Sequence, residues 1–148
     1  MDEGEHPSDA TKSARTRYLI RVTHSSGMLE GKYTKDTTFP PTDHRSHRPK
    51  SWLINGLKKI ETLQFLVGPG RTLGQAALQW LLADERIACC LPNIYEEAQL
   101  REFAAASESP ALTREELDRV AELAAGNFGI ADEVHNYKGT MTREPAAV

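Results

Sequence analysis

Apolar side chains recur at helical spacing in two neighbouring stretches of the chain. In residues 51–66 and again in residues 72–83 they fall on one face, at intervals of three and four positions. The second stretch begins with Thr72 and Gln75, the residue types and spacing of a capping box. We therefore predict two helices, of which the second has an apolar stripe suited to packing on a sheet. The two tryptophans are expected in this core: Trp52 and Trp80.

Two further helices are predicted toward the C-terminus. Residues 96–106 follow a Pro-Asn turn and have a helical pattern. Thr113 and Glu116 form a second capping-box pair, and the helix that they open ends at Gly126. Most of the secondary structure is therefore helical.

Two short apolar runs predict β-strands. Residues 18–23 contain β-branched side chains and end at a Ser-Ser-Gly loop. Residues 87–91 are unbroken by polar side chains, which is typical of a strand buried on both faces of a parallel sheet. Helices separate the two runs, so we expect a right-handed parallel crossover. Two parallel strands alone leave two open edges, and this predicts that they need neighbours that the sequence does not supply.

The remaining segments are polar. Residues 1–17 are expected to be disordered, residues 18–125 to form the ordered domain, and residues 126–148 to form an extended tail. Residues 27–50 are predicted to be a long loop, and its basic run, from Arg45 to Lys50, is interpreted as a solvated segment.

Length, charge and cysteine content exclude several classes of protein. The 148 residues suit one domain, and a net charge of −3 gives no reason to expect a nucleic-acid partner or an anionic membrane. No run approaches the roughly 20 apolar residues of a membrane span, and the N-terminal segment has no secretory signal pattern. Cys89 and Cys90 are adjacent and lack partners at metal-ligand spacing, so we expect buried free thiols in the cytoplasm.

Several motifs, in a fixed order, resemble the aldo/keto reductase family. Residues 70–83 resemble that family's helix before its last barrel strand, with the pattern t-x-x-Q-x-A-L-x-W, and residues 87–92 resemble the last strand itself. Residues 99–102 match a Q-L-x-E motif in the next helix, and residues 27–33 match a G-x-L-x-G-K-y loop. The resemblance implies an α/β fold, namely the C-terminal part of a (β/α)₈ TIM barrel with two or so parallel strands.

The resemblance also implies a function. The family transfers hydride from a nicotinamide to a carbonyl, and its catalytic Asp, Tyr, Lys and His lie on earlier strands, so no catalytic residue is assigned to this chain. We expect a cofactor-binding half that is inactive alone. The residues implied at the pyrophosphate of NADP or NAD are Thr23, His24, Ser25, Gly27, Leu29 and Lys32. Those implied at the adenosine are Asn93, Ile94, Tyr95, Gln99 and Glu102.

The chain departs from the family pattern near these residues. The family often has Ser-Pro-Leu where residues 22–24 stand, and Asn where Phe103 stands. Tyr95 offers no positive charge to a 2′-phosphate, and Glu96 and Glu97 add repulsion, so the choice between NADP and NAD stays open. The alternative function is a non-catalytic module that pairs with a second copy or a complementary chain through exposed strand surfaces.

Overall fold

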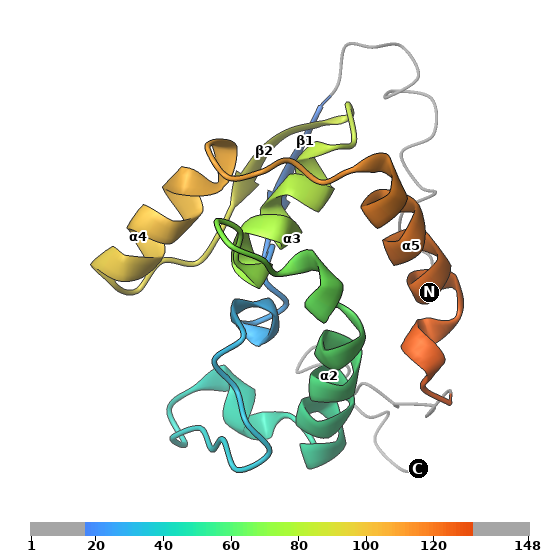
Figure 1. Cartoon of the computed structure of the whole chain (residues 1–148). Coiled ribbons are helices and arrows are strands. Elements are labelled where there is room, and N and C mark those ends of the chain that lie inside the picture. The colour runs from blue at the N-terminus through green and yellow to red at the C-terminus, as the bar shows by residue number, and fades with distance from the viewer. Residues whose placement is uncertain (1–16, 132–148) are drawn as a thin grey trace, which may run out of the picture.

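The computed structural model describes residues 17–131, in which helices pack beside a small parallel sheet (Figure 1). Strand β1, Tyr18–Arg21, pairs in parallel with β2, Ile87–Leu91, and the register is irregular between Tyr18 and Leu19. The connection from β1 to β2 passes through two helices, as the sequence predicts. No third strand joins the sheet within the described residues.

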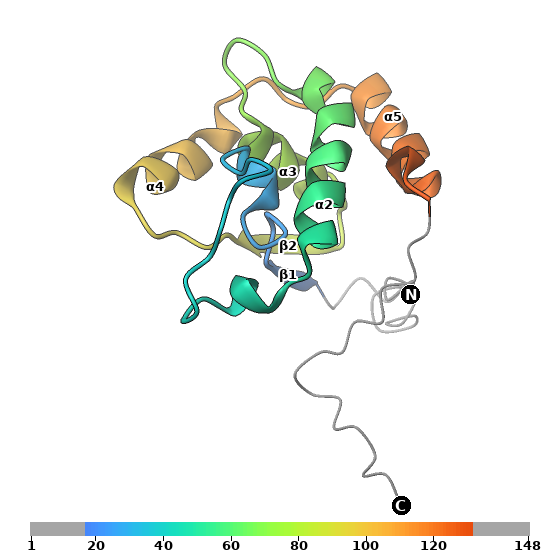
Figure 2. The ribbon, with the colours of Figure 1, turned by 90° about the horizontal axis from the view of Figure 1, so that it is seen from below.

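Four α-helices follow the predicted segments closely. They are α2, Lys50–Thr62; α3, Leu73–Leu82; α4, Glu97–Ala104; and α5, Arg114–Ala125. Short 3₁₀ turns extend or connect them at Met28–Glu30, His44–His47, Gln64–Leu66, Ala105–Ser107 and Asn127–Gly129. The two views agree that α4 and α5 lie on opposite sides of α3 (Figures 1 and 2).

Both predicted capping boxes are confirmed. The Thr72 hydroxyl accepts from the Gln75 backbone N–H, and the Gln75 side chain accepts from the Thr72 N–H. Thr113 and Glu116 make the same reciprocal pair at the start of α5. Each box satisfies two N–H groups that the first helical turn would otherwise leave without acceptors.

Two apolar clusters form the core. The larger one lies between α2, α3 and α5 and includes Leu53, Ile60, Leu73 and Val120. The smaller one joins Leu78 of α3 to Phe103 and Ala106 after β2. Because α3 contributes to both clusters, it is the central element of the fold.

The prediction that the strand at residues 87–91 is buried on both faces is wrong. Cys89 is exposed, Cys90 is half-buried, and Leu91 is 46% exposed. Burial raises the pKa of Cys90, so that thiol keeps its proton more firmly than a free thiol does. The physical reason for the exposure is that, among residues 17–131, α3 packs against β2 but no further strand lies beside it, so the rest of the strand surface stays open.

Two other expectations also differ from the structure. Trp80 was expected in the core but is 43% exposed, because the second half of the α3 stripe borders an open cavity; Trp52 is half-buried. The predicted extended tail does not begin at residue 126, since Asn127–Gly129 is a 3₁₀ turn whose Phe128 packs on the larger cluster. Residues 1–16 and 132–148, which include nearly all of the predicted disordered segment and most of the tail, lie outside the described residues.

Candidate functional site

The loop after β1 has an unusual backbone. Val22, Ser25 and Ser26 have φ angles of 58°, 50° and 59°, and Gly27 has a φ of 88°. Positive φ is uncommon for residues other than glycine, and for a β-branched valine it is a marked exception. Tight turns follow, in which Ser25 N–H donates to Val22 O at 3.0 Å and Leu29 N–H donates to His24 O at 3.1 Å.

This loop leaves backbone donors available. Four of its backbone N–H groups donate no hydrogen bond within residues 17–131. They are those of Thr23, His24, Ser26 and Gly27. Unpaired backbone N–H groups in a tight turn can donate to an anion such as phosphate. The chemistry that the loop offers is therefore anion binding by the main chain.

The side chains of Thr23 and His24 point into the protein. His24 is only 3% exposed, its Nε2 donates to Gly74 O at 3.1 Å, and its ring stacks on Phe103 with centroids 4.3 Å apart. A carbonyl oxygen only accepts, so Nε2 carries the proton. The imidazole is thus buried in internal contacts, and only the backbone of His24 can bind a ligand. Two departures from the family pattern, at residues 24 and 103, contact each other here.

The loop after β1 and the segment after β2 come together in space. Lys32 Nζ lies 2.6 Å from Glu96 Oε1, and Gln99 Nε2 donates to Glu30 Oε2 at 2.7 Å. Each contact joins the loop after β1 to the segment after β2, across more than 60 residues of sequence. The hydrogen bond that Lys32 donates to Glu96 raises the pKa of Lys32, which therefore stays cationic.

The other predicted site residues differ in exposure. Gln99 is buried and accepts from Tyr95 N–H at 2.8 Å, so it ties α4 to the preceding loop. Glu102 is half-buried and accepts from the Thr72 hydroxyl at 2.6 Å. Leu29 packs on the larger core cluster. Three residues have exposed side chains on the segment between β2 and α4: Asn93, Ile94 and Tyr95.

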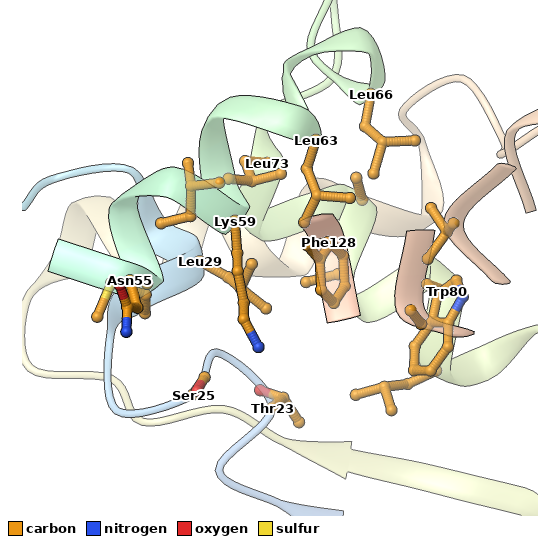
Figure 3. A pocket seen from close by; sticks show the side chains of 18 of the residues that line it. Thr23, Ser25, Leu29, Asn55, Lys59, Leu63, Leu66, Leu73, Trp80 and Phe128 are labelled. Atoms are coloured by element: carbon orange, nitrogen blue, oxygen red, sulfur yellow. The ribbon is translucent and has the colours of Figure 1, made fainter. Parts of the chain in front are cut away.

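An apolar cavity of about 420 Å³ lies between the loop after β1 and the helices α2, α3 and α5 (Figure 3). Thr23 and Ser25 line one end of it, and the cationic group in its wall is Lys59. Lys59 Nζ donates to Asn127 Oδ1 at 2.7 Å and lies 5.3 Å from the centre of the Phe128 ring. The cavity lining contains no acid–base pair, so the cavity by itself provides a binding space and no proton transfer.

Sequence reasoning missed three residues of the site. Glu30 is the partner of Gln99, and Tyr33 and Arg45 contact the carbonyl of Ser26. Arg45 belongs to the basic run that was interpreted as solvated, and that interpretation is wrong for this residue, because its guanidinium is largely buried. The G-x-L-x-G-K-y motif already included Tyr33 and was the available signal for it.

Two other classes of feature are not found among residues 17–131. None of the helices there combines the length and the apolar character that crossing a bilayer requires. No three His, Cys, Asp or Glu side chains in that range gather as the ligands of a metal ion would.

Comparisons with known proteins match the same part of the chain. The sequence model of the aldo/keto reductase family matches residues 20–125. The chain is also similar to the L-glyceraldehyde 3-phosphate reductase of Escherichia coli O157:H7, with 30% identity over 106 residues that cover 65% of this chain and 30% of that protein. The matched region contains β2, the second half of β1, the four described α-helices and the two loops of the site. The chain belongs to the aldo/keto reductase family.

Proposed function

We propose that the chain forms the cofactor-binding side of an NAD(P)-dependent carbonyl reductase. The observation that carries this proposal is the convergence of the loop after β1 with the loop after β2, which is made by Lys32 with Glu96 and by Gln99 with Glu30. Aldo/keto reductases generally bind NAD(P)H, and both loops lie inside the family match. We further propose that β1 and β2 are the last two strands of a (β/α)₈ barrel.

The residues of the chain would hold the cofactor and leave the chemistry to other groups. The free N–H groups of Thr23, His24, Ser26 and Gly27 would donate to the pyrophosphate, and Lys32 would balance part of its charge. When bound, the nicotinamide supplies the hydride. The family's proton-donating residues have no counterpart among the residues assigned to this site, so we propose that the chain is inactive as a reductase by itself.

The charges around Lys32 disfavour the additional 2′-phosphate of NADP. Glu96 and Glu30 both lie close enough to Lys32 to raise its pKa. Tyr95, next to Glu96, is 72% exposed and brings no positive charge. We therefore propose that the site does not prefer NADP over NAD, because a 2′-phosphate beside these carboxylates would meet repulsion.

Removing the charge of Glu96 should strengthen dinucleotide binding. In Glu96→Gln, Lys32 loses its carboxylate partner and becomes available to the pyrophosphate. Since two unit charges about 4 Å apart in water interact by about 1 kcal/mol, we expect affinity for NADH and NADPH to rise roughly fivefold. Fluorescence titration of the full chain with each dinucleotide measures the change.

The matched control for this titration is Glu122→Gln. Glu122 is an exposed carboxylate on α5, on the far side of α3 from α4, and its substitution should leave the affinity unchanged (Figure 1). If neither the unsubstituted chain nor Glu96→Gln binds a dinucleotide saturably, the proposed function is wrong.

A second function, a non-catalytic module that pairs through its strands, is favoured by the exposure of the sheet. Leu19 of β1 is 56% exposed and Leu91 of β2 is 46% exposed. Exposed apolar residues on an open strand can pair with a second chain. We therefore expect the unsubstituted chain to self-associate. Leu19→Lys should shift it toward a monomer.

Size-exclusion chromatography with light scattering distinguishes the two states. Leu100→Lys is the control, because Leu100 is similarly exposed, at 51%, but lies on α4. An unsubstituted chain that stays monomeric at every accessible concentration would rule out pairing with a second copy.

A further inference from the structure

Tyr33 and Arg45 reach back from the long loop onto the main chain of the candidate anion site. The Tyr33 hydroxyl donates to Ser26 O at 2.7 Å, and Arg45 Nη1 donates to Tyr33 Oη at 2.5 Å. A second Arg45 hydrogen bond, 3.5 Å long, reaches Ser26 O directly. Two side chains therefore converge on a single carbonyl oxygen.

The guanidinium of Arg45 is held from several sides. Asp43 accepts from Arg45 Nε at 2.9 Å and from Nη2 at 2.5 Å, which is a bidentate pair. The same carboxylate accepts from the Arg45 backbone N–H, and these hydrogen bonds lower the pKa of Asp43 to about 2. The ring of Phe39 lies 4.7 Å from the guanidinium. Because Asp43 neutralises its charge, Arg45 is not itself a free cation for a phosphate.

The carbonyl that they hold belongs to the same peptide as a free donor. Ser26 C=O and Gly27 N–H share one planar trans unit, in which they point in opposite directions. A donor that fixes Ser26 O therefore also aims Gly27 N–H away from Tyr33. Burial raises the pKa of Tyr33, so its hydroxyl keeps the proton that it donates.

The loop needs such support because its backbone is unfavourable. Ser25 and Ser26 both have positive φ angles, which serine adopts reluctantly. Gly27 is the only residue type that fits its position, since a Cβ atom there would lie 2.5 Å from Tyr33 Oη. Tyr33 thus packs directly on the turn whose peptide it orients.

We propose that Tyr33 and Arg45 are positioning residues that hold the Ser26–Gly27 peptide so that Gly27 N–H faces the cofactor phosphate. The inference rests on the proposed function, because that function supplies the phosphate. Neither side chain contacts the phosphate in this arrangement. Both act through the main chain, and Asp43 acts through Arg45.

The test compares Tyr33→Phe and Arg45→Met with the unsubstituted full chain. Loss of one net hydrogen bond is worth up to about 1.4 kcal/mol, so we expect NADH affinity to fall by up to roughly tenfold. In the absence of dinucleotide, we also expect amide hydrogen exchange in the peptide that covers residues 25–28 to accelerate by a similar factor. A change in bulk packing alone would not confine the faster exchange to this turn.

Tyr18→Phe is the matched control. The Tyr18 hydroxyl is buried and has no hydrogen-bond partner among residues 17–131, so its removal should change neither affinity nor loop exchange. Failure of the unsubstituted chain to bind NADH would overturn the proposed function, whereas the exchange measurement on the free protein still reports whether Tyr33 orders the turn. If the chain binds NADH and Tyr33→Phe changes neither readout, the positioning role is refuted while the cofactor site stands.

Discussion

Replacing Arg71 with methionine should lower the free energy of unfolding by about 3 kcal/mol, the low end of the cost of removing one partner from a largely buried ion pair. The Arg71 side chain is 10% exposed and forms an ion pair with Glu116, which is 19% exposed. It also donates to Leu66 O at 2.8 Å and to Pro110 O at 3.1 Å. The substitution would leave Glu116 Oε1 and these carbonyls without their donor, and would uncouple α5 from the 3₁₀ turn Gln64–Leu66.

Urea unfolding followed by tryptophan fluorescence measures this loss. Arg101→Met is the matched control, because Arg101 pairs with Glu97 on the surface of α4 with both side chains more than 70% exposed. Such a pair contributes only about 0.5 kcal/mol or less. Equal losses in the two variants would contradict the special role of Arg71.

The same ion pair predicts the direction of a pH effect. The hydrogen bond from Arg71 lowers the pKa of Glu116 below its usual 4.5. The unfolded chain therefore takes up this proton first, and the stabilisation is present above pH 4.5 and is lost as the pH falls toward the folded-state pKa. In Arg71→Met this part of the acid sensitivity should disappear.

Phe103→Ala should cost about 3 kcal/mol, because truncation of a buried aromatic ring removes apolar burial and leaves a cavity. Phe103 is 6% exposed, packs with Leu78 and Ala106, and stacks on His24. The ring therefore supports both the smaller core cluster and the loop after β1. We expect faster hydrogen exchange at Leu29, whose N–H donates to His24 O, in addition to the loss of stability.

Two control variants distinguish the effect of lost side-chain volume from the effect of the buried position of Phe103. Phe103→Leu keeps most of the apolar volume and should cost less than about 1.5 kcal/mol. Leu100→Ala removes a half-exposed side chain from the same helix and should cost far less than Phe103→Ala. If Leu100→Ala and Phe103→Ala are equally destabilising, the smaller cluster does not contribute as described.

Short-range signals in the sequence determined the elements of this fold. The capping boxes at Thr72 and Thr113 lie where the sequence predicts them, because both partners of each box are three residues apart. The order of strands and helices follows in the same way, since periodicity is a property of neighbouring residues. The family motifs also placed the two loops of the candidate site on the correct sides of β1 and β2.

Only the tertiary structure decided which side chains meet. His24 stacks on Phe103, and Lys32 pairs with Glu96. Arg45, from the basic run, donates to Ser26 O in the turn after β1. No local pattern encodes these contacts, because their partners are separated by 19 to 79 residues and the contact depends on the path of the chain between them. The sequence did not predict the exposure of Trp80 and Cys89 for a similar reason. Burial depends on what packs beside a residue, whereas hydrophobicity is a property of the residue alone.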